Sequence, residues 1–166
     1  MKYKYNKKKA ERAVAFIEKY LTHTKGELGG KPFILEEFQK EEILKPLFGW
    51  VDESGMRKYR TCYIEIPRKN GKSNLCAAIV LYQLFCSGEI GQEIISAAAD
   101  RSQASIVFSI AKQMVLQNPE LNKRAKVFRN SITIESTGSF YKAISSESNT
   151  AHGMNISTLI FDELHT

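Results

Sequence analysis

A short polar loop between a strand-like and a helix-like segment constrains this chain more than any other feature. Residues 59–66, YRTCYIEI, are rich in aromatic and β-branched residues and predict a strand. The loop PRKNG follows, and then the apolar stretch KSNLCAAIVLYQLFCSG, which predicts a helix that ends near Gly88. A strand, a short loop and a buried helix in succession favour an α/β fold.

The rest of the chain extends this pattern in both directions. Apolar spacing predicts helices over 8–21 and 35–48, the second bent or ended by Pro46. After Gly88 we expect a strand over 93–99 and a helix over 101–117, capped by Asp100 and closed by Asn118-Pro119. Short strands are expected over 126–129, 132–136, 139–144 and 157–163. The order predicts a mostly parallel sheet flanked by helices.

Composition excludes several classes of protein. Hydrophobic residues make up 43% of the 166 residues and charged residues 25%, which argues against wholesale disorder. No apolar run approaches the roughly 18 residues that cross a bilayer, and no apolar stretch follows the basic start as in a signal peptide. Cys62, Cys76 and Cys86 lack CxxC spacing, which argues against zinc and suits a reducing cytosol. We expect all three in the core.

The net charge of +6 comes mainly from the N-terminus. Five lysines and no acid fall in the first nine residues, so the charge is weak evidence for nucleic-acid binding. A second basic cluster near residue 125 suits either DNA phosphates or a solvated face, the latter being more common. The cluster consists of Lys123, Arg124, Lys126 and Arg129.

The loop at 66–73, IPRKNGKS, fits the second half of the phosphate-binding motif GxxxxGK[ST]. Gly71 lets the backbone approach a phosphate, and the start of the following helix offers an anion site. Lys72 can reach the β- and γ-phosphates, and the Ser73 hydroxyl can ligate Mg²⁺. Ile66 replaces the first glycine of the motif, and Arg68 adds a second cation for transition-state charge.

The strand predicted at 157–163, STLIFDE, ends in two carboxylates. Ligands bind at the carboxyl end of such strands, where Asp162 suits a Mg²⁺ ligand and Glu163 a base that activates water. With the loop at 66–73, this strand predicts nucleotide hydrolysis. An ordinary turn remains the simpler interpretation of either motif alone.

Three segments in order strongly resemble the large terminase subunit of tailed bacteriophages: IEIPRKNGKS, AAADRSQASIVFSIAKQMV and SNTAHGMNISTLIFDELHT. The resemblance covers Phe33 to Thr166 and implies an ASCE-type P-loop NTPase core. It implies ATP and Mg²⁺ as cofactors, double-stranded DNA as substrate, and the portal protein and small terminase subunit as partners. It also implies a homo-oligomeric ring and the cytoplasm of a bacterial host.

The resemblance also implies roles for individual residues. Glu163 and Arg68 are the expected catalytic pair, and Ser73 and Asp162 the expected metal ligands. Gln39, in FILEEFQK, is similar to a glutamine that reads adenine, although an exposed helix residue is an equal alternative. The expected nucleotide-binding set is Gln39, Arg68, Lys69, Asn70, Gly71, Lys72 and Ser73.

The resemblance therefore implies an ATPase that powers the movement of viral DNA into a procapsid. We expect a basic tail and helix over 1–31 and a partial ATPase domain over 32–166, without the family's nuclease domain. Ala151-His152-Gly153 stand where some relatives have a trans-acting arginine. Two alternatives stay open. One is a DExH helicase, from Asp162-Glu163-Leu164-His165, and the other is a truncated nucleotide-binding module without turnover.

Overall fold

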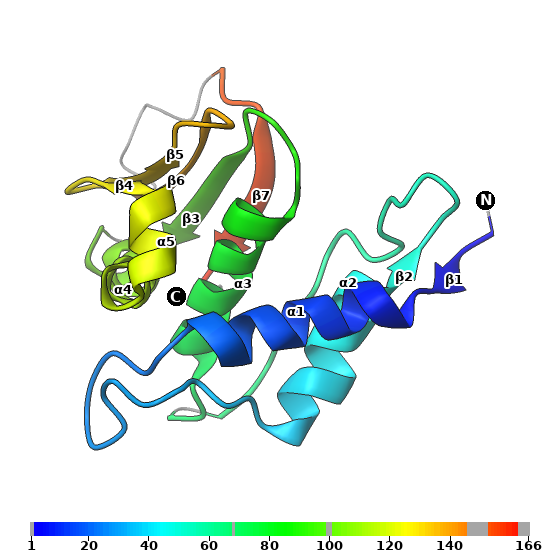
Figure 1. The fold of residues 1–166 in the computed structure, drawn as a ribbon, viewed down its shortest axis with the longest axis horizontal. Helices are drawn as coiled ribbons and strands as arrows, with labels where there is room; N and C mark the ends of the chain where they lie inside the picture. Colours follow the sequence, from blue (N-terminus) through cyan, green and yellow to red (C-terminus); the bar gives the residue numbers. More distant parts are fainter. Residues whose placement is uncertain (1, 68, 99–100, 146–152, 163–166) are drawn as a thin grey trace.

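A five-stranded sheet forms one layer of the molecule (Figure 1). The computed structural model describes residues 2–67, 69–98, 101–145 and 153–162. The strands lie in the order β4-β5-β6-β3-β7, with β3 parallel to both β6 and β7 and β5 antiparallel to β4 and β6. Their bounds are β3 (Glu93–Ala98), β4 (Lys126–Val127), β5 (Ser131–Ile134), β6 (Ser139–Ser145) and β7 (Ile156–Phe161). The predicted α/β sheet is confirmed, and it is mixed in strand direction.

Two helices, α3 (Lys72–Cys86) and α4 (Arg101–Gln117), pack against each other and against β6, and so cover one face of the sheet. The middle of α3 is buried all round, which explains its nearly unbroken apolar sequence. Asn118 does more than close α4, because its side chain caps a further helix, α5 (Pro119–Arg124). None of the helices in the described parts of the chain is long and apolar enough to cross a membrane.

The N-terminal part packs on the outer side of α3. Here α1 (Lys7–Tyr20) crosses α3, as Figure 1 shows, and buries Ala13, Phe16 and Ile17 in the same core. The predicted second helix begins as a π-helix, η1 (Gln39–Leu44), and continues as α2 (Lys45–Gly49). Pro46 lies directly after the junction of η1 and α2, so the helix changes type there and runs on to Gly49 rather than ending at Pro46. A small antiparallel pair, β1 (Lys4–Tyr5) and β2 (Trp50–Val51), completes this part.

The strand predicted over 59–66 is absent from the structure. This segment is irregular, and Tyr63 is 77% exposed. Aromatic and β-branched residues form a strand only where a neighbour accepts the backbone hydrogen bonds, and among the described residues no strand pairs with this one. The expectation that Cys62 lies in the core is wrong for the same reason, because it is exposed.

Candidate functional site

The loop before α3 turns through two residues in the left-handed region. Lys69 has a φ of 70° and Gly71 a φ of 74°. The Asn70 side chain donates a hydrogen bond to the Pro67 carbonyl over 3.2 Å, and Gly71 then serves as the N-cap of α3. No acidic residue lies in the first turn of α3, so the positive end of its dipole faces the loop without a fixed counter-charge from its own helix.

The first turn of α3 contacts the end of β7. The Ser73 hydroxyl donates a hydrogen bond to Oδ2 of Asp162 over 3.1 Å, across 89 residues of chain. The Lys72 ammonium lies 3.6 Å from Oδ1 of the same carboxylate. The three residues that the sequence predicts for phosphate and metal binding are therefore brought together at the carboxyl end of β7.

Asp162 is 7% exposed, while the Lys72 side chain is 29% exposed. Oδ1 of Asp162 has no hydrogen-bond partner among the described residues, because the Lys72 ammonium is an ion-pair partner beyond hydrogen-bond distance. A buried carboxylate oxygen without a donor is costly, and a cation there removes the cost. A hydroxyl and a carboxylate in contact are also the ligands with which Mg²⁺ joins nucleotide phosphates. The residues present therefore fit a Mg²⁺ site.

Gln39 lies beside the loop, although it comes from η1. It is 3% exposed, and its Oε1 accepts a hydrogen bond from the Glu36 backbone N–H over 2.9 Å. A Cβ added to Gly71 would lie 3.9 Å from Nε2 of Gln39, so the amide nitrogen faces the turn that begins α3. The alternative that Gln39 is an exposed helix residue is wrong.

Cys76 is a neighbour of the site that the sequence motifs do not identify. Burial raises the pKa of its thiol to about 12, and the nearby Asp162 carboxylate adds to the rise. The thiol is therefore neutral at physiological pH and adds no negative charge beside Asp162. Its position three residues after Ser73, close to one helical turn, is the sequence signal that could have placed it there.

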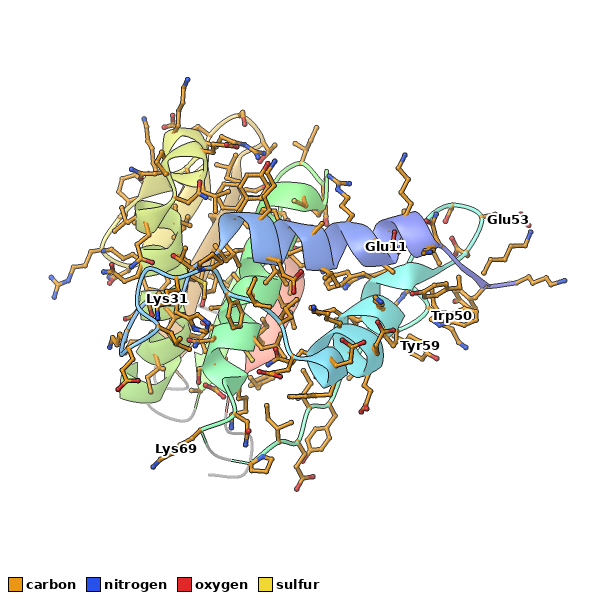
Figure 2. All side chains as sticks on the ribbon, turned by 60° about the horizontal axis from the view of Figure 1, so that its bottom comes forward. Glu11, Lys31, Trp50, Glu53, Tyr59 and Lys69 are labelled. Carbon is orange, nitrogen blue, oxygen red and sulfur yellow. The ribbon has the colours of Figure 1, made fainter. Side chains whose placement is uncertain are left out.

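Not every predicted site residue can be placed. Arg68, Glu163 and the capping Asp100 lie outside the described residues. Lys69 is exposed and projects outward near the start of α3 (Figure 2). Asn70 is exposed in the same turn.

Comparison with known proteins identifies a family for most of the chain. A family model described as the terminase large subunit, ATPase domain, matches residues 37–166. The chain is 34% identical to the terminase large subunit of Enterobacteria phage HK97, over 93% of the chain and 30% of that protein. It is 27% identical to the terminase large subunit of Lactococcus phage p2, over 99% of the chain and 32% of that protein. The chain thus spans about a third of the length of these relatives.

The fold agrees with a solved structure as well. The crystal structure of the HK97 bacteriophage large terminase matches with a TM-score of 0.77 and 31% identity, over 92% of this chain and 30% of that one. This match confirms the predicted ASCE-type P-loop NTPase fold.

Proposed function

Because the chain belongs to the terminase large subunit family and matches its ATPase domain, we propose that it hydrolyses ATP to power the movement of viral DNA into a procapsid. The observation that carries the proposal is the contact of Ser73 and Lys72 with Asp162. It joins the loop before α3 to the end of β7, and such a junction serves phosphate binding in this fold.

The proposed roles follow from charge. The Lys72 ammonium binds the β- and γ-phosphates, assisted by the N-terminus of α3. Phosphates beside the buried Asp162 carboxylate bring together more negative charge than one ammonium offsets, so a further cation is required. Ser73 and Asp162 would hold Mg²⁺, which neutralises phosphate charge and orients the phosphates.

Two further residues complete the proposed chemistry. Glu163 follows Asp162 directly, and we assign its carboxylate to accept a proton from the attacking water. Arg68 precedes Lys72 by four residues, and its guanidinium would offset charge that develops on the γ-phosphate.

Gln39 is proposed to contact the adenine base. Its Oε1 already accepts the Glu36 N–H, so Nε2 is the better placed donor for a ring nitrogen. Replacement of Gln39 by Ala should weaken the preference for ATP over GTP. The ratio of the two dissociation constants measures this, and an unchanged ratio would remove Gln39 from base recognition.

The wider role is proposed from the relatives. A packaging motor of this kind acts on double-stranded DNA in the cytoplasm of a bacterial host. It would work as a homo-oligomeric ring together with a portal protein and a small terminase subunit.

Turnover of ATP by the chain tests the proposed activity. We expect Lys72→Ala to lower the rate of phosphate release at least a hundredfold, because the ammonium acts on the transferred phosphate. Lys25→Ala is the matched control, since Lys25 is exposed in the loop that follows α1. Equal rates for Lys72→Ala and the parent chain would overturn the assignment.

A second variant separates binding from chemistry. Glu163→Gln should leave the affinity for ATP and Mg²⁺ within a few-fold of the parent while phosphate release stops. A variant that hydrolyses ATP normally would exclude Glu163 as the base.

A further inference from the structure

A second concave site lies where α1, the end of α3 and α5 meet. Its volume is about 370 Å³, within the range of small-ligand pockets. Cys86 at its edge is the last residue of α3 and Lys72 the first, so this pocket lies about 20 Å along the helix from the phosphate loop. It is therefore separate from the site described above.

The lining of this pocket carries excess positive charge. Arg12, Lys19 and Arg124 line it together with a single carboxylate, Glu120. Within the described parts of the chain, none of these three cations lies within salt-bridge distance of a carboxylate. Three cations against one carboxylate give the lining of the pocket a net positive charge.

Cys86 lines the pocket together with Arg12 and Arg124, and both guanidinium groups are close enough to its thiol for their charge to favour the thiolate. Burial nevertheless raises the pKa of the Cys86 thiol, so it does not supply a compensating thiolate at neutral pH. Two arginines in the lining of one pocket are suited to a phosphate, whose oxygens accept hydrogen bonds from their N–H groups.

Three aromatic residues, Phe16, Tyr20 and Phe85, also line the pocket. Phe16 is tilted against Tyr20 at 5.4 Å and stacked on Phe85 at 6.3 Å between ring centroids. The Arg124 guanidinium lies over the Phe85 ring at 5.3 Å, and Nη2 of Arg124 donates to the Phe85 carbonyl over 3.3 Å. These contacts hold Arg124 at the edge of an apolar surface.

We propose that this pocket binds a nucleoside phosphate, either as a free nucleotide or as one unit of a nucleic-acid strand. Arg12 and Arg124 bind the phosphate, and the half-buried Tyr20 ring contacts the sugar or base. The inference does not depend on the phosphate loop or on ATP hydrolysis.

The test uses the chain with Lys72→Ala, so that binding at the phosphate loop does not contribute. The probes are thymidine monophosphate and a fluorescent oligo(dT) of six nucleotides, with affinity measured at low salt. Binding of both indicates a free nucleotide as ligand, while binding of the oligonucleotide alone indicates a strand.

Two substitutions within the pocket should weaken binding of the probes for different reasons. Arg12→Ala removes a phosphate contact, and Ala15→Trp fills the pocket without altering charge; both residues are exposed on α1. Each should weaken binding at least tenfold. Arg60→Ala, an exposed arginine outside the pocket, should change it less than twofold. The proposal is overturned if neither probe binds, or if both pocket variants bind as tightly as the parent.

Discussion

Gly71 and Gly88 are two glycines with nearly the same backbone conformation, one at each end of α3. Their φ angles are +74° and +76°, and neither would bring an added Cβ closer than 3.9 Å to a neighbouring atom. Alanine at either position should therefore lower the free energy of unfolding by about 1 kcal/mol, through backbone strain alone. Chemical denaturation of both variants measures this.

The variants Gly71→Ala and Gly88→Ala also distinguish an effect on ATP binding from a general loss of stability. Gly71→Ala should weaken ATP binding, because a distorted turn displaces the start of α3, whereas Gly88→Ala should leave ATP binding unchanged. Equal ATP affinity in the two variants would show that the turn at Gly71 does not shape the nucleotide site.

Because of Cys76, the free energy of unfolding should fall as the pH rises above 9. Its thiol titrates at 9.0 ordinarily and at about 12 in the fold, so the unfolded chain loses this proton first as pH rises. The contribution of the neutral Cys76 thiol to the free energy of unfolding is complete below pH 9. Between pH 9 and 12 this contribution is lost at about 1.4 kcal/mol per pH unit. Replacement of Cys76 by Ala should reduce this slope between pH 9 and 10.5. An unchanged slope would contradict the assigned burial.

At the scale of elements, α1 is an integral layer over α3. Ile17 is fully buried in the shared core, whereas Ile34 is 60% exposed in the loop before η1. Ile17→Ala should lower the free energy of unfolding by about 2–4 kcal/mol. The matched change Ile34→Ala should stay within about 0.5 kcal/mol. Urea titrations compare the two, and a small loss at Ile17 would show that α1 is not part of the cooperative unit.

The sequence could predict those elements whose pattern and neighbours agree. The apolar residues of α3 are buried, and the β-branched residues of β7 lie in a strand that pairs with β3. In both elements the local sequence preference agrees with the tertiary contacts. Residues 59–66 have an equally good strand pattern, but no strand in the described parts of the chain pairs with them. Pairing is a property of the whole fold, and a local pattern does not contain it.

The same distinction holds for the site. The contact of Lys72 and Ser73 with Asp162 could be predicted, because both motifs are recognisable from residue type and spacing. The burial of Gln39 could not, since it follows from the packing of η1 beside the loop. The pocket between α1 and α5 unites residues that share no motif.

At the scale of the whole molecule, the site depends on the sheet. Ser73 begins one helix and Asp162 ends a strand 89 residues later, and the order of β3 and β7 sets their distance. No single segment holds both groups, so the proposed Mg²⁺-dependent nucleotide binding would require this architecture to form.

The most direct test is the affinity for ATP with and without Mg²⁺ in the parent chain, in Ser73→Ala and in Asp162→Asn. We predict that Mg²⁺ tightens ATP binding at least tenfold in the parent and less than twofold in either variant. Without Mg²⁺, Asp162→Asn should bind ATP no more weakly than the parent, because a carboxylate that repels phosphate is gone. If Asp162→Asn keeps the full effect of Mg²⁺, then Ser73 and Asp162 do not form the metal site and the account is wrong.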